Sequence, residues 1–243
     1  MAPRLAPPVE LPRRFYKVVS TAPAEGGSAV LLDGRTVRTP GGRPLTVPTP
    51  ALADRLAAEW EAQATHIDMT SMPAVRLAST AIDFIPGARD GVAAEIGQYG
   101  GSDGLCYFAD GPEALVQAQT QRWGPMLDWA ERAMDLRFER VTGIGHRDQP
   151  AETLERIVQL AQAEDDFVLA GLAHATALFG SAILALALGR GELDADAAFE
   201  LSRLDEGFQQ ERWGVDEEAA ERTANMRAEA LMLGRWFEAL RAS

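Results

Sequence analysis

Acidic side chains gather near the C-terminal end of the chain, where two expected helices meet. Asp205, Glu206 and Glu211 lie on one expected helix beside its apolar face, and Glu217 follows soon after Trp213. Paired carboxylates can perform general acid–base catalysis or bind a hard cation. The same groups can dock the arginines of a partner protein, or they can simply solvate a helix. The residues leave these alternatives open, and they rank catalysis below the other two.

The sequence lacks phosphate- and nucleotide-binding motifs, and it lacks a serine-hydrolase motif in the required strand-to-helix context. There is no Gly-rich loop ending in Gly-Lys-Ser/Thr, and the only lysine, Lys17, lies in an expected strand. No Gly-x-Gly-x-x-Gly occurs, and the one Gly-x-Ser-x-Gly match, residues 100–104, lies in an expected loop that follows a helix, whereas a nucleophile elbow follows a strand. The three histidines (His66, His146 and His174) are not paired at helical spacing, and a single cysteine, Cys106, excludes a Cys-rich metal site. The sequence therefore predicts no catalytic residue, no metal ligand and no cofactor.

Charge is distributed unevenly along the chain. The formal net charge is −13, yet residues 1–50 carry seven basic and three acidic groups, whereas residues 191–243 carry six and thirteen. Binding to phosphates needs a basic surface, so nucleic acid is not an expected partner. The acidity favours a basic or neutral protein surface as partner, or it serves only to keep the protein soluble.

Strand and turn signals dominate residues 15–48. Residues 15–19 have strand composition, residues 29–32 and 35–38 flank an Asp33-Gly34 hairpin signal, and residues 45–47 follow two glycines. They predict an antiparallel sheet of three or four strands, which must pack against the elements that follow it.

Helical periodicity begins at Thr49, a favourable N-cap with Pro50 in the first helical position. Further helices are expected at 73–84, 89–99, 112–134 with an interruption near Gly124-Pro125, 152–163, 165–188, 194–213 and 216–240. We predict an α+β protein in three parts. A proline-rich mobile arm spans residues 1–12, a small antiparallel β-containing N-terminal domain 13–100, and a mainly helical C-terminal domain 101–243.

Residues 167–188 form an uncharged stretch of twenty-two residues, long enough to span a bilayer. Its many alanines, its glycines and His174 lower its hydrophobicity, and Trp and Tyr are absent from its ends. A buried central helix is therefore expected rather than stable membrane insertion. The first fourteen residues contain no apolar signal segment and do not resemble a transit peptide, which predicts a cytoplasmic protein. A monomer is the expected oligomeric state.

Several segments, in this order and spacing, resemble the mitochondrial and α-proteobacterial chaperones for the α subunit of the F-type ATP synthase. These are Arg14-Phe15-Tyr16-Lys17, Leu32-Asp33-Gly34-Arg35, Thr39-Pro40, Trp60, Gln63, Ile67, Met72-Pro73, Thr80-Ala81-Ile82-Asp83, Asp103, Leu105-Cys106-Tyr107, Gln119, Trp123, Pro125, Trp129, Ser202-Arg203-Leu204-Asp205-Glu206, Trp213-Gly214 and Glu217. They cover about residues 13–220.

The resemblance implies a protein that binds an unassembled α subunit, shields the surface that later contacts a β subunit, and does not hydrolyse ATP. It also implies a functionally sensitive acidic residue that Asp205 matches, although relatives often carry glutamate there. The expected partner-binding residues are Asp205, Glu206, Glu211, Trp213 and Glu217. The alternative is a metal-dependent or hydrolytic enzyme that uses the acidic cluster around Asp205 and Glu217.

Overall fold

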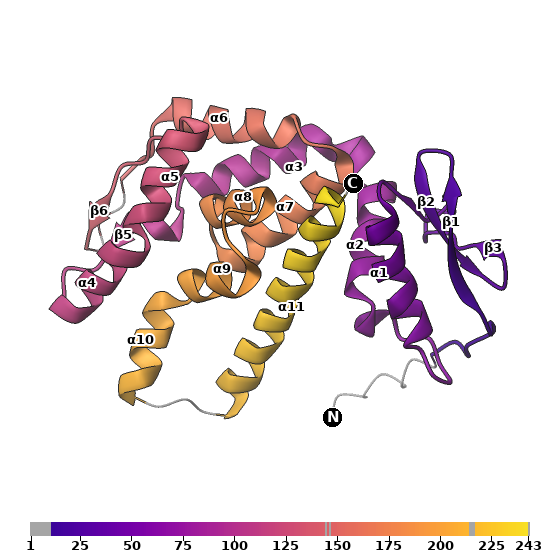
Figure 1. The fold of residues 1–243 in the computed structure, drawn as a ribbon. Coiled ribbons are helices and arrows are strands. Elements are labelled where there is room, and N and C mark those ends of the chain that lie inside the picture. The colour runs from indigo at the N-terminus through magenta and orange to yellow at the C-terminus, as the bar shows by residue number, and fades with distance from the viewer. Residues whose placement is uncertain (1–10, 144, 146, 214–216, 243) are drawn as a thin grey trace, which may run out of the picture.

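A small antiparallel sheet lies at one end of a body of helices in the computed structural model (Figure 1), so the predicted α+β class is confirmed. The structure describes residues 11–143, 145, 147–213 and 217–242. Nearly all of the arm predicted for residues 1–12 lies outside the described residues.

The sheet is built around β2 (Gly27–Leu32), which pairs with β1 (Val19–Ala24) on one side. On the other side it pairs with β3 (Arg35–Thr36) and β4 (Thr46–Val47), and all three pairings are antiparallel. The predicted hairpin is confirmed: Asp33 and Gly34 have φ of 48° and 76°, as its turn requires.

The strand expected at residues 15–19 was wrong, because β1 begins only at Val19. The carboxylate of Asp33 accepts the N–H groups of Lys17 and Val18 at 3.1 and 2.9 Å. Further back, the N–H of Arg14 donates to the carbonyl of Thr65 at 2.9 Å. A side chain and a loop therefore take the hydrogen bonds that a strand ladder would otherwise make.

Helix α1 (Pro50–Glu61) covers the sheet with its buried Leu52, Leu56 and Trp60. Its predicted cap is present, since Thr49 Oγ1 accepts the N–H of Leu52 at 3.1 Å. A 3₁₀ turn (Met69–Ser71) then leads into α2 (Pro73–Asp83), which packs against α7 (Asp166–Phe179) of the helical body.

The helical body contains α3 (Ile85–Gly100), α4 (Glu113–Arg122), α5 (Gly124–Met134), α6 (Ala151–Gln162), α7 (Asp166–Phe179), α8 (Ala182–Arg190), α9 (Ala195–Ser202), α10 (Leu204–Trp213) and α11 (Glu217–Arg241). Between α3 and α4 a 3₁₀ turn (Gly104–Cys106) precedes β5 (Tyr107–Phe108), which pairs in parallel with β6 (Val141–Thr142). Helix α8 is the centre of the core, because every residue from 182 to 188 is buried. The predicted division at residue 100 stays a prediction; α3 itself packs against α6 and α7.

Two expected helices are each broken in the structure. The stretch 165–188 is divided at Gly180, whose φ of 62° ends α7, and at Ser181, whose Oγ accepts the N–H of Leu184 and caps α8. The stretch 194–213 is divided at Arg203, where φ is −115° between α9 and α10. Among the described residues no helix is long and apolar enough to cross a membrane.

Candidate protein-binding site

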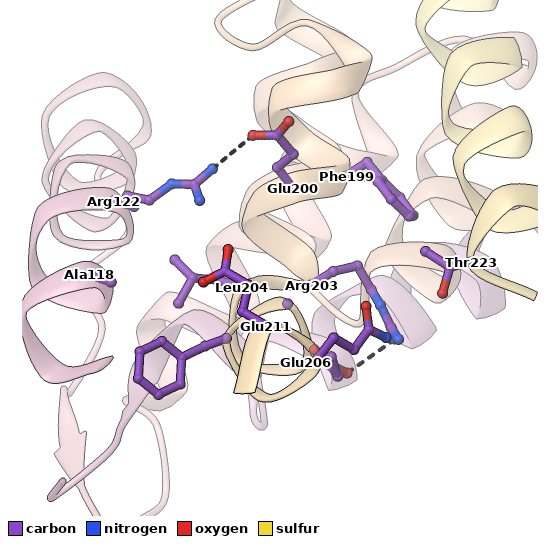
Figure 2. Close-up of a pocket in the computed structure, with 12 residues that line it drawn as sticks. Ala118, Arg122, Phe199, Glu200, Arg203, Leu204, Glu206, Glu211 and Thr223 are labelled. Atoms are coloured by element: carbon purple, nitrogen blue, oxygen red, sulfur yellow. Dashed lines mark hydrogen bonds and ion pairs between the residues drawn. The ribbon is translucent and has the colours of Figure 1, made fainter. Parts of the chain in front are cut away.

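A groove of about 450 Å³ is formed by side chains of α4, α9 and α10, and Thr223 of α11 completes its wall (Figure 2). Its charged lining consists of Arg122, Glu200, Arg203, Glu206 and Glu211. Helix α10 supplies two of the carboxylates that line the groove, Glu206 from its first turn and Glu211 from its last turn.

Most of these charges are paired within the groove. Arg122 binds Glu200 at 3.1 Å, and Arg203 binds Glu206 at 3.1 Å (Figure 2). Exposed pairs of this kind contribute little to stability and exchange readily with other partners. Glu211 is exposed, and it has no ion pair with any residue that the structure describes. The groove is therefore acidic, with arginines that already occupy two of its carboxylates.

Asp205 lies beside this groove and is held by a buried glutamine. Gln119 is fully buried, and its Oε1 accepts the N–H of Ala109 at 2.8 Å. The amide orientation is thereby fixed, so its Nε2 donates to Asp205 Oδ1 at 2.7 Å. Burial raises the pKa of Asp205, the Gln119 bond opposes that rise, and the charge of Glu206 adds to it.

A smaller cavity of about 200 Å³ lies next to Asp205 and has an apolar floor of Leu105, Trp123, Phe179 and Leu201. The indole of Trp123 is anchored because its Nε1 donates to the Leu201 carbonyl at 3.0 Å. A half-buried carboxylate above an apolar pocket can accept the charged head of an arginine while its stem packs below.

The five predicted site residues do not all meet. Asp205 lines the smaller cavity, Glu211 the larger, and Glu206 both. Glu217 is exposed in the first turn of α11 and lines neither cavity. Trp213 ends α10, and its side chain lies outside the described part of the chain.

Sequence reasoning gave no role to Gln119, Arg122, Glu200 or Arg203, although they complete the site. Gln119 was singled out only through the family resemblance, because a glutamine in a polar helix carries no sign of burial. Within the described ranges, no group of three or more His, Cys, Asp or Glu side chains could hold a metal ion.

Two solved structures and one curated protein are similar to this chain. The structure matches crystal structures of Atp12 from Paracoccus denitrificans (43% identity, TM-score 0.89, covering 95% of this chain and 99% of that one) and of the Atu1473 protein from Agrobacterium tumefaciens, named as a candidate chaperone (45% identity, TM-score 0.88, covering 95% and 87%). The curated protein "Protein atp12, mitochondrial" of Schizosaccharomyces pombe is 27% identical over 222 residues, which is 86% of this chain and 76% of that protein.

The likeness to these proteins over nearly the whole chain, one of them named as a candidate chaperone, places the protein among chaperones, a class that is generally non-enzymatic. A family described as "ATP12 chaperone protein" matches residues 13–131, and this chain belongs to the ATP12 chaperone family. The resemblance stated from the sequence is confirmed, and membership supports a chaperone role in ATP synthase assembly.

Proposed function

We propose that this protein binds the unassembled α subunit of the F-type ATP synthase and keeps it competent for assembly, without hydrolysing ATP. Unassembled subunits expose an interface that otherwise aggregates, and a partner that covers it shifts the population toward soluble species. No catalytic centre is needed for this, because the whole effect is one of binding.

The observation that carries the proposal is the Asp205 carboxylate, held by Gln119 at the boundary between two cavities. A carboxylate whose orientation is fixed before binding loses little entropy when it pairs with an arginine of the client. Glu206 and Glu211 extend the acidic surface along α10, and we place Trp213 and Glu217 at its far end as further partner-binding residues.

The test is suppression of the aggregation of α subunit diluted from denaturant, followed by light scattering without ATP. We expect Asp205→Lys and Glu206→Lys to keep the fold and to weaken rescue by roughly tenfold, since a charge-assisted pair becomes a repulsion. Glu155→Lys is the matched control, because Glu155 is an exposed carboxylate on α6 that makes the same charge change away from the groove. Unchanged rescue by both α10 variants would remove the acidic groove from the mechanism.

The competing function is a metal-dependent or hydrolytic enzyme that uses Asp205 and Glu217. These residues do not line a common cavity. Metal analysis of the purified protein by mass spectrometry separates the two functions, because stoichiometric metal would revive the enzyme.

We place the protein in the bacterial cytoplasm, while its fission-yeast relative is named as mitochondrial.

A further inference from the structure

Among the described residues, no strand pairs with the outer edge of β1. β2 pairs with β1 on one side and with β3 and β4 on the other, so in the described part of the chain β1 has a single strand neighbour. β1 is six residues long, and a strand of that length is enough for a further strand to pair with.

The register shows which backbone groups face outward. The N–H of Asp33 donates to the carbonyl of Val18 at 2.9 Å, which marks these two residues as a hydrogen-bonded pair. Bonded and non-bonded pairs alternate along an antiparallel ladder, so Val19 and Thr21 direct their N–H and C=O groups away from β2. None of the residues described forms a hydrogen bond with those outward groups.

Apolar side chains are exposed directly beside this edge. Phe15 is 75% exposed and Val18 59% exposed, among the most exposed large hydrophobic side chains of the described residues. The hydroxyl of Thr21 donates to Asp54 on α1 at 2.8 Å, so the odd-numbered side chains of β1 face the helix. Because side chains alternate along a strand, Val18 lies on the opposite, uncovered face.

The segment that carries this edge is basic, although the protein as a whole is acidic. Residues 11–50 carry six basic and two acidic side chains, against a net charge of −13 for the chain. Arg13 and Lys17, which precede β1, are exposed, and neither has an ion pair with a described residue. Two nearby acids already accept hydrogen bonds: Asp33 from the N–H groups of the chain before β1, and Asp54 of α1 from the Thr21 hydroxyl.

We propose that the outer edge of β1 binds an extended, acidic segment of a client protein, which joins the sheet as an additional strand. Val19 and Thr21 supply the main-chain hydrogen bonds, Phe15 and Val18 the apolar contact, and Lys17 the ion pair. The sheet lies at the opposite end of the molecule from α10 (Figure 1), so this inference does not depend on the acidic groove or on the identity of its client.

A second copy of the chain fits this edge poorly. Two β1 edges related by a two-fold axis would bring the same net basic segment, residues 11–50, of both copies to one contact, and this like charge is unfavourable. Pro23, the next outward residue along β1, has no N–H to donate and would shorten such a symmetric pairing at both ends. An acidic segment avoids the charge repulsion, and it loses the Pro23 hydrogen bond at one end only.

The probe is a peptide of about seven residues that alternates valine or threonine with glutamate. It is added to isotope-labelled full-length protein, and backbone amide shifts and hydrogen exchange are recorded by NMR. We expect saturable shifts and slowed exchange at Val19 and Thr21. The same peptide with its pairing amides N-methylated, or with lysine in place of glutamate, should bind at least about tenfold more weakly, because it loses its hydrogen bonds or its charge.

Two substitutions at one position isolate the backbone. Thr21→Pro removes the outward N–H and leaves the ladder to β2 intact, and Pro23 shows that this edge accepts proline. Thr21→Val loses the same hydroxyl bond to Asp54 and keeps the N–H. We expect a roughly tenfold loss of peptide affinity for Thr21→Pro and less than about a twofold change for Thr21→Val. Lys17→Glu should reverse the preference, so that the lysine peptide binds better.

Equal binding by the two Thr21 variants, with native thermal unfolding in both, would overturn strand addition. Shifts confined to residues outside β1 and its flanks would also overturn it. Without peptide, the Val19 amide should not exchange more slowly as protein concentration increases. If it does, and sedimentation shows a dimer, the occupant is a second copy and the client proposal is wrong.

Discussion

Gln119 fixes where the Asp205 carboxylate points, and its removal is predicted to weaken chaperone activity more than stability. Gln119→Leu leaves the N–H of Ala109 without its acceptor and Asp205 without its donor. A buried N–H without a partner costs about 1–3 kcal/mol, which lowers the unfolding free energy but leaves a protein of ordinary stability folded. The freed carboxylate should lose about fivefold in client affinity, measured by titrating α subunit at a temperature where the variant is folded.

Gln117→Leu is the control, because this exposed neighbour on α4 bonds only to Glu113. It should leave both quantities unchanged. If Gln119→Leu lowers stability while client affinity stays the same, Gln119 has only a structural role.

Protonation of Asp205 gives a second prediction at the scale of one residue. Burial raises its pKa, so the carboxylate loses its charge at a higher pH than an ordinary aspartate. Client affinity should therefore fall on acidification through that pKa. The unfolding free energy should instead rise on acidification, because the folded state holds a proton that the unfolded state has released. This stabilisation is fully present below the pKa of Asp205 in the unfolded state. It is lost as pH rises through the pKa of Asp205 in the folded state.

Asp205→Asn keeps an acceptor for Gln119 and cannot ionise, so its client affinity should be low and should not change over the pH range in which the wild type titrates. Parallel titrations of affinity and of unfolding free energy against pH check both signs. If the affinity of Asp205→Asn is lower than that of the wild type but changes with pH in the same way, the pH dependence comes from another group.

The sequence identified the carboxylates of the site, but not the residues that orient them. Asp205, Glu206 and Glu211 stand out because three acids on one helix are conspicuous. Gln119 does not, because its role depends on a bond to residue 109 and another to residue 205, which only the tertiary fold brings together. Arg203 was assigned to a helix interior, whereas it lies at the break that lets α10 turn away from α9.

The break between α7 and α8 is stabilised by a buried side-chain network. Ser181 Oγ accepts the N–H of Leu184 at 3.1 Å and donates to Asp103 Oδ2 at 2.9 Å. Ser181→Ala should lower the unfolding free energy by about 1–2 kcal/mol, since it removes an N-cap and leaves a buried carboxylate less well bonded. Ser79→Ala, inside α2, is the opposite control: its hydroxyl only returns to its own helix, so alanine there should be neutral or stabilising. Urea unfolding measures both.

Asp103 adds a pH dependence to this element. Burial raises its pKa to about 6, although the N–H of Ile183 and the hydroxyl of Ser181 favour the charged form. Stability from this group is present below the unfolded pKa of 3.8 and is lost as pH rises through about 6. The unfolding free energy of the wild type minus that of Asp103→Asn should therefore fall by about 1 kcal/mol between about pH 5 and 7.5. A difference that rises over this range would mean that the bonds outweigh burial.

Element types were largely predictable, and the breaks were not. Thr49-Pro50 and Asp33-Gly34 are local signals whose chemistry suffices to define a helix start and a turn. Gly180-Ser181 carries a comparable signal, a helix-ending glycine followed by a capping serine, but it was hidden inside an uninterrupted apolar stretch. What favours the break is Asp103, which is far away in sequence and adjacent only in the folded chain.

At the scale of the whole molecule, charge is segregated between the two ends. The sheet end is basic, while the groove at α10 and the rest of the body are acidic. Such a distribution orients a charged partner during approach and makes its association rate depend on salt. The composition indicated the segregation along the sequence, but only the fold turns it into a separation in space.

Salt dependence distinguishes steering by the exposed carboxylates of α10 and the start of α11 from steering by the total charge. We expect the association rate with α subunit, measured by stopped flow, to fall on the order of tenfold as ionic strength rises from about 0.05 to about 0.5 M. Replacing Glu211 and Glu217 together by glutamine should flatten that dependence, because both are exposed carboxylates of α10 and α11. The matched double variant Glu152→Gln with Glu155→Gln removes the same charge from α6 and should leave the dependence as it is. If the two double variants flatten it equally, the net charge of −13 steers the client, and the carboxylates of α10 and α11 act only after contact.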